Sequence, residues 1–187
     1  MTVAALEHPE PWTEAEYLAL PESKQRVELL DGTLLVTPAP GIGHQQWARR
    51  LANLLEAAAP ADVDVAEGVN LRVGPSRLLI PDVLVVRGRG EVKVHEAADA
   101  LLVVEVLSPS SVSIDRVLKP HLYAAAGVSR YLRVEPGPAQ LPELWLYELG
   151  PGGYEERARA AGTEALALTD PFPARIDPAA LTRRTRG

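Results

Sequence analysis

The chain has 187 residues, 47% of them hydrophobic, so it can bury one sizeable core, and we expect a single domain. It contains no cysteine, which excludes disulfides, thiolate zinc sites and cysteine nucleophiles. The net charge of −6 argues mildly against a dedicated nucleic-acid binder, but it does not exclude a nuclease, because acids gathered at a metal site lower the charge and bound cations restore it locally.

Neither the N-terminus nor any apolar run has the pattern of a targeting or membrane segment. Residues 1–11 contain no basic cluster followed by an apolar core, so no secretory signal is expected. The longest apolar runs are interrupted by Pro, Asp and Glu and fall short of the 18 or so residues of a membrane span. We therefore expect a cytoplasmic protein.

The N-terminal half contains clear start and turn signals. Thr13 followed by Glu16 forms a capping-box pattern, which predicts a short helix ending at about Ala19. Asp31-Gly32 between two apolar runs predicts a hairpin, with Glu28 on its first strand. Apolar residues at helical spacing then predict a helix from His44 to Ala59.

The middle of the chain has the pattern of strands. Residues 63–73 alternate as a half-buried strand does. The runs 78–86 and 100–107 are dense in β-branched residues and apolar on both faces, which is typical of central strands covered on both sides.

The C-terminal part continues with one helix and further strands. Residues 114–126 fit a helix, but Pro120 requires a kink or a late helix start, and Gly127 suits the C-terminal cap. A strand is expected from Tyr131, and residues 144–160 have the pattern of an antiparallel addition.

Two acids stand out because each interrupts an apolar strand pattern. A carboxylate buried in such a place costs several kcal/mol, roughly, unless it is paired, hydrogen-bonded or bound to a metal. Asp82 and Glu105 either sit at exposed strand ends or converge on a hard cation, which takes oxygen ligands. The second interpretation requires the two strands to be neighbours.

The order of acids resembles that of the PD-(D/E)XK nuclease superfamily, and more closely that of the bacterial Uma-two family of restriction-endonuclease-like proteins. The resemblance covers about residues 12–136. It is carried by the following residues: Glu28-x-x-Asp31-Gly32, Pro38, His44, Pro81-Asp82-Val83, Glu105-Val106-Leu107-Ser108-Pro109-Ser110, Asp115, Lys119, Tyr123, Gly127-Val128 and Tyr131.

The resemblance implies an α/β (α+β) fold with a restriction-endonuclease-like mixed central β-sheet flanked by helices. The core would span about 12–136, and residues 137–187 would add antiparallel strands and a tail. It also implies a Mg²⁺ or Mn²⁺ site formed by Asp82, Glu105, the carbonyl of Val106 and Glu28, and an endonuclease that hydrolyses phosphodiester bonds.

Leu107 stands where the superfamily has its lysine, two residues after the glutamate. The Uma-two pattern implies that Lys119 replaces it, reaching in from the next helix on its long flexible stem. The alternative is that Lys119 only pairs with Asp115, four residues earlier on the same helix surface.

Three further residues are candidate substrate contacts. His44 is either a phosphate contact or proton donor, or a capping or surface histidine. Ser108 either contacts substrate or forms the turn around Pro109. Tyr123 either hydrogen-bonds in the site or packs in the core.

Three functions remain open at this point. The first is a metal-dependent endonuclease acting on DNA, expected as a homodimer. The second is a metal-dependent phosphodiesterase with another nucleic-acid substrate, such as RNA. The third is a non-catalytic nucleic-acid-binding or protein-interaction module, which the acidic balance and the missing Glu-x-Lys favour slightly.

Overall fold

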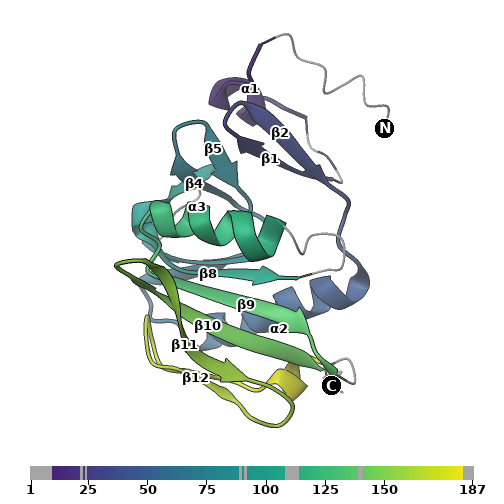
Figure 1. The fold of residues 1–187 in the computed structure, drawn as a ribbon, viewed down its shortest axis with the longest axis vertical. Helices are drawn as coiled ribbons and strands as arrows, with labels where there is room; N and C mark the ends of the chain where they lie inside the picture. The colour runs from purple at the N-terminus through teal and green to yellow at the C-terminus, as the bar shows by residue number, and fades with distance from the viewer. Residues whose placement is uncertain are drawn as a thin grey trace.

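The computed structural model of the chain describes residues 10–21, 23, 25–88, 90, 92–107, 114–138 and 141–182. Two β-sheets and two main helices make up most of it (Figure 1). The expected α+β fold with a mixed sheet and flanking helices is confirmed.

The smaller of the two main sheets is formed by the N-terminal hairpin and three short strands. Its order is β2-β1-β5-β4-β7, and all neighbours are antiparallel except the parallel pair β4 and β7. The strands are β1 (Arg26–Leu30), β2 (Thr33–Thr37), β4 (Asn70–Gly74), β5 (Arg77–Leu79) and β7 (Val94–Glu96).

The larger sheet has six strands in the order β11-β10-β9-β8-β6-β3, with one parallel pair, β8 and β9. The central strands β6 and β8 are antiparallel neighbours, as the metal-site interpretation required. The strands are β3 (Val63–Ala66), β6 (Val83–Arg87), β8 (Ala100–Val106), β9 (Arg130–Pro136), β10 (Pro142–Gly150) and β11 (Gly153–Ala160). The C-terminal hairpin β10–β11 extends the sheet beyond β9, which confirms the expected antiparallel addition.

Three helices and three shorter helical turns complete the described chain, with a small two-stranded sheet near its end. They are α1 (Glu14–Leu18), α2 (Ile42–Ala58), the 3-10 turn η2 (Ala97–Asp99), the π-helical turn η3 (Ile114–Leu118), α3 (Lys119–Ala125), β12 (Leu166–Leu168), β13 (Ala174–Ile176) and the 3-10 turn η5 (Pro178–Leu181). No helix in the described part of the chain is long and apolar enough to cross a membrane.

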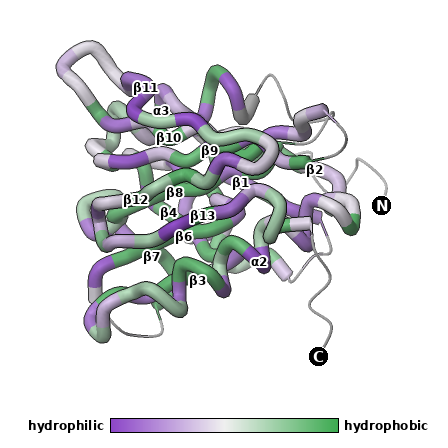
Figure 2. Tube along the Cα trace, turned by 90° about the horizontal axis from the view of Figure 1, so that it is seen from below, coloured by the Kyte–Doolittle hydropathy of each residue, from purple (hydrophilic) through white to green (hydrophobic). Residues whose placement is uncertain are grey.

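The six-stranded sheet has a hydrophobic layer on each face, because alternate residues of its central strands point to opposite sides. On β8, Leu102 and Val104 belong to a core cluster with α2, β12, β13 and η5, whereas Val103 belongs to a second cluster with α3. Glu105 shares the parity of Val103 and so lies on the α3 side. Figure 2 shows the interior strands of this sheet as predominantly hydrophobic.

The local signals of the N-terminal half produce the expected structures. The Thr13 hydroxyl accepts the Glu16 N–H at 3.3 Å, and the Glu16 carboxylate accepts the Thr13 N–H at 2.9 Å, so the capping box forms. Asp31 (φ 49°) and Gly32 (φ 79°) both occupy the left-handed region that a tight two-residue hairpin turn requires.

Two expected strands are each divided in the structure. Residues 63–73 break at Glu67-Gly68 into β3 and β4, which belong to different sheets; Gly68 takes a positive φ of 66° there. The apolar run 78–86 breaks at Ile80-Pro81-Asp82 into β5 and β6, because Pro81 has no N–H to continue a ladder. The chain therefore passes from one sheet to the other at Pro81-Asp82.

The expected disturbance at Pro120 is a late helix start. A π-helical turn precedes α3. Pro120 lies in the first turn of α3, where a backbone N–H would have no partner within that helix. At the other end Gly127 has φ 81°, and the Val128 N–H donates to the Tyr123 carbonyl at 3.0 Å, which completes a glycine-based C-cap.

Candidate active site

Four side chains expected to carry the chemistry meet in one buried cluster, although each comes from a different segment. Glu28 comes from β1, Asp82 from the sheet crossing, Glu105 from β8 and Lys119 from the start of α3. Their exposed fractions are 2%, 4%, 0% and 2%. Such buried charges are stable only when they compensate one another.

Lys119 lies between two of the acids. Its Nζ is 3.0 Å from Glu28 Oε1 and 3.1 Å from Glu105 Oε1. The lysine therefore points into the cluster and not toward solvent, which removes the interpretation of Lys119 as part of a surface pair only. Glu28 is held on its other side by the Ile80 N–H, which donates to Glu28 Oε1 at 2.7 Å.

Tyr123, one helical turn after Lys119, is fully buried, and its hydroxyl donates to Glu105 Oε1 at 2.6 Å. Burial, and then the charges of Glu105 and Glu28, raise the pKa of Tyr123 well above its ordinary value. The tyrosine thus remains a donor that orients the Glu105 carboxylate. Both sequence interpretations of Tyr123 apply in part, since it packs in the core and hydrogen-bonds in the site.

Asp82 is fixed by three donors. Its Oδ2 accepts the Val106 N–H at 2.7 Å and lies 3.1 Å from His44 Nε2, and its Oδ1 lies 2.5 Å from Arg26. Burial acts to raise the pKa of Asp82, but the His44 hydrogen bond, the Arg26 charge and the Val106 N–H together lower it to about 2. Asp82 is therefore an anion held next to the backbone of Glu105-Val106.

His44 lies in the first turn of α2, facing Asp82. Its side chain is 12% exposed, so it is neither a surface residue nor deeply buried. Its Nδ1 is buried with no hydrogen-bond partner among the described residues. The position is compatible with contact to a molecule bound over Asp82. Ser108, the other polar candidate, lies outside the described residues.

Arg26 is the residue that the sequence interpretation missed. Its side chain is 21% exposed, so it occupies the open side of the cluster. Burial acts to lower the pKa of Arg26, but the charges of Asp82 and Glu105 outweigh it, so the pKa is raised above its ordinary value and Arg26 stays cationic. The sequence did contain a signal for Arg26. It stands two residues before Glu28 in β1, so the two side chains point to the same face of the strand.

The donor chemistry of the cluster fits a hard divalent cation. Carboxylates and a backbone carbonyl are the oxygen ligands that Mg²⁺ and Mn²⁺ prefer, and Asp82 already lies against the residue after Glu105. Among the described residues, no three acid or imidazole side chains are yet close enough to hold a metal ion. Arg26 and Lys119 hold the carboxylates instead, so metal binding requires the acids to exchange these partners.

Replacing Tyr123 with phenylalanine tests its contact with Glu105. A hydrogen bond to a charged group contributes about 1.5–3 kcal/mol, and a neutral one about 0.5–1.5 kcal/mol. We expect Tyr123→Phe to lower the free energy of unfolding by about 1.5–3 kcal/mol, the range for a charged partner. Urea denaturation measures this loss. The control is Tyr154→Phe, because the Tyr154 hydroxyl donates to the neutral Val128 carbonyl at 2.8 Å. Equal losses would contradict a charged partner for Tyr123.

Comparisons with known proteins define first the fold and then the family. The chain is similar to a solved protein from Anabaena variabilis ATCC 29413, described as a "putative nuclease belonging to DUF820", with a TM-score of 0.72 over 91% of this chain and 97% of that one. At 16% identity this likeness establishes the fold.

The family follows from the sequence. A family model described as "Uma2: Putative restriction endonuclease" matches residues 14–182, so the chain belongs to the Uma2 family. The resemblance drawn from the sequence is confirmed. A search of curated proteins gave no match.

Proposed function

We propose that this protein is a metal-dependent endonuclease that hydrolyses phosphodiester bonds in DNA. The observation that carries the proposal is that Lys119 joins Glu28 and Glu105, while the charges of these two acids and of Asp82 all act on Arg26. A scaffold without chemistry has no need of three buried acids from distant segments, because each costs desolvation energy. The family description agrees with nuclease activity.

Asp82, Glu105 and the carbonyl of Val106 would hold Mg²⁺ or Mn²⁺, with Glu28 as a further ligand or positioning group. When bound, the ion supplies charge stabilisation at the phosphate and lowers the pKa of a water. Glu105 is oriented for this task by Tyr123, and Asp82 by the Val106 N–H.

The basic side chains take complementary tasks. The Lys119 ammonium, placed between Glu28 and Glu105, would orient the attacking water and offset the negative charge that builds on the phosphorus centre. Arg26, on the open side, would bind a non-bridging phosphate oxygen through its planar fork of donors. His44 would contact the phosphate or give a proton to the leaving oxygen.

The test is cleavage of supercoiled plasmid DNA with Mn²⁺ or Mg²⁺ and with EDTA. We expect the unaltered protein to nick or linearise the plasmid only with metal, and Glu105→Gln to reduce cleavage to background. The matched control is Glu164→Gln, which removes an exposed carboxylate far along the chain and should cut normally. Metal-independent cutting, or equal cutting by Glu105→Gln, would overturn the proposal. Single-stranded DNA and RNA substrates tested in parallel distinguish the phosphodiesterase alternative.

One observation favours the non-catalytic alternative. Arg26 pairs with Asp82, and Lys119 pairs with Glu28 and Glu105, so the acids are compensated without any metal. If no nucleic acid is cut and divalent metal leaves the melting temperature unchanged, the interaction module becomes the better proposal. The homodimer and the cytoplasmic location stay predictions, and analytical ultracentrifugation tests the first.

A further inference from the structure

A pocket of about 250 Å³ lies beside α3, on the side of the helix away from the acids. Its walls come from η3, α3 and the strands β9, β10 and β11. The lining residues that matter for its chemistry are Arg116, His121, Tyr131, Arg133, Tyr147 and Tyr154.

The pocket and the candidate active site share the same helix and the same sheet face. On α3, Lys119 and Tyr123 contact Glu105, whereas Pro120 and Ala124, each one residue later, line the pocket. On the sheet, Arg133 of β9 is the register partner of Glu105 on β8. Figure 1 shows α3 lying over these strands. The pocket and the acids therefore lie on different sides of α3, and they are linked by that helix and by the Glu105–Arg133 register pair.

The pocket has an aromatic wall. Tyr131 stacks between Tyr147 and Tyr154, with ring centroids 5.8 and 5.6 Å apart. The Arg133 guanidinium lies 5.1 Å from the Tyr147 ring centroid, which adds a second planar group. Tyrosine rings and arginine planes are the surfaces on which proteins stack unpaired bases.

The pocket is also basic. Arg116 and Arg133 both pair with a single carboxylate, Glu135, and His121 stands at the exposed rim. No acidic side chain is present among the described residues that line the pocket. The guanidiniums of Arg116 and Arg133 supply donors for an anion such as a phosphate, and the acids near Tyr147 are Glu135 and the exposed Glu156.

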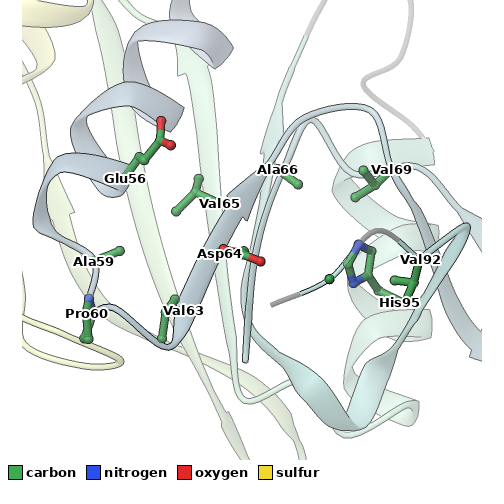
Figure 3. A pocket seen from close by; sticks show the side chains of 11 residues that line it. Glu56, Ala59, Pro60, Val63, Asp64, Val65, Ala66, Val69, Val92 and His95 are labelled. Carbon is green, nitrogen blue, oxygen red and sulfur yellow. The ribbon is translucent and has the colours of Figure 1, made fainter. Parts of the chain in front are cut away.

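A second pocket, of about 440 Å³, has the opposite character (Figure 3). Its lining includes Glu56 and Asp64 with several valines and His95, and it has no lysine or arginine among the described residues. Nucleic acid is repelled by such a lining, so the aromatic pocket is the more suitable of the two for a strand of the substrate.

We propose that the aromatic pocket binds one unpaired nucleotide of the nucleic-acid strand next to the bond to be cut. Its volume is below the roughly 300–1,000 Å³ of drug-sized ligand sites, which suits one base and excludes a duplex. The base stacks on the Tyr147 side of the tyrosine wall, and Arg116 binds the adjoining phosphate. The inference rests on the proposed nuclease function for its choice of ligand.

The test separates binding from cleavage. Fluorescein-labelled single-stranded DNA, single-stranded RNA and duplex DNA are titrated in EDTA with the full chain carrying Glu105→Gln, and fluorescence anisotropy gives Kd. In this background we compare Tyr147→Leu, Tyr147→Phe and Arg116→Gln. The matched control for Arg116 is Arg175→Gln, an exposed arginine on β13, on the α2 side of the sheet.

We expect single strands to bind more tightly than duplex. Tyr147→Leu should weaken binding by roughly 5- to 150-fold, because stacking contributes about 1–3 kcal/mol per base, and Tyr147→Phe should bind as the parent does because the ring is retained. Arg116→Gln, on a half-exposed side chain that should not disturb folding, should weaken binding and reduce its salt dependence, whereas Arg175→Gln should do neither.

Two results would overturn the proposal: no binding of any oligonucleotide by the Glu105→Gln chain, or equal Kd values for Tyr147→Leu and Tyr147→Phe together with no effect of Arg116→Gln. Preference for DNA or RNA single strands identifies which polymer supplies the nucleotide. If single strands bind and Tyr147→Leu weakens that binding, but the unaltered chain does not cut them, the pocket proposal is supported and the nuclease function is contradicted. Failure of the pocket proposal is therefore distinguishable from failure of the proposed function.

Discussion

Lys119→Met is expected to abolish plasmid cleavage and to lower the free energy of unfolding by about 3–5 kcal/mol. The variant keeps the length of the side chain but removes the ammonium that lies between Glu28 and Glu105. Two buried carboxylates are then left near each other without the cation that joined them, and their repulsion destabilises the fold. Removing one partner of a buried ion pair is among the costliest single changes.

Urea denaturation measures the loss, and Lys93→Met, at an exposed lysine, is the matched control with an expected change below about 0.5 kcal/mol. Divalent metal provides a second readout. Because a cation at the acids replaces the missing charge, Mn²⁺ should raise the melting temperature of Lys119→Met more than that of the unaltered chain. A loss of stability equal to that of Lys93→Met would show that Lys119 does not compensate the acids.

Asp82→Asn is expected to reduce cleavage by about 10³-fold, which corresponds to roughly 4 kcal/mol of transition-state stabilisation from the metal site. The amide is isosteric with the carboxylate but has one acceptor in place of two. If its oxygen accepts the Val106 N–H, its NH₂ group faces the Arg26 guanidinium, donor against donor. Asp62→Asn, at an exposed aspartate, should cut normally.

The same variant has a distinct dependence of stability on pH. The folded-state pKa of Asp82 is lowered to about 2, below its unfolded value of 3.8, so its ionised form stabilises the fold above pH 3.8. This contribution, about 2 kcal/mol, is lost as the pH falls from 3.8 toward 2. The difference in unfolding free energy between the unaltered chain and Asp82→Asn should therefore shrink over that window. A constant difference would contradict the lowered pKa.

The sequence predicted most of the helix ends and turns because each is determined by interactions between residues close together in the chain. The capping box at Thr13, the Asp31-Gly32 turn and the glycine after α3 each fix the backbone within a few residues. The two divided strands were not predicted, since an apolar run such as 78–86 reads the same whether it enters one sheet or two. The division of this run is determined by tertiary pairing, which places β5 in one sheet and β6 in the other.

The sequence predicted which acids form the candidate site, but it did not predict which side chains those acids contact. Asp82 and Glu105 were visible as charges in apolar runs, and the family pattern supplied Glu28 and Lys119. Arg26 was missed because an arginine at a strand start looks like any surface charge until the partner Asp82, 56 positions away, is placed beside it. That Lys119 reaches both Glu28 and Glu105 depends on the packing of α3 against two sheets.

The passage of the chain between sheets at Pro81-Asp82 makes the site a composite of two layers. Asp82 and Glu105 belong with the six-stranded sheet, whereas Glu28 is carried by the β1–β2 hairpin of the other sheet. Local opening of that hairpin withdraws Glu28 while the remaining acids stay in place. The Ile80 N–H, which donates to Glu28, then loses its acceptor and can exchange its hydrogen with solvent. The hydrogen-exchange rate of this amide therefore measures how often the site is assembled.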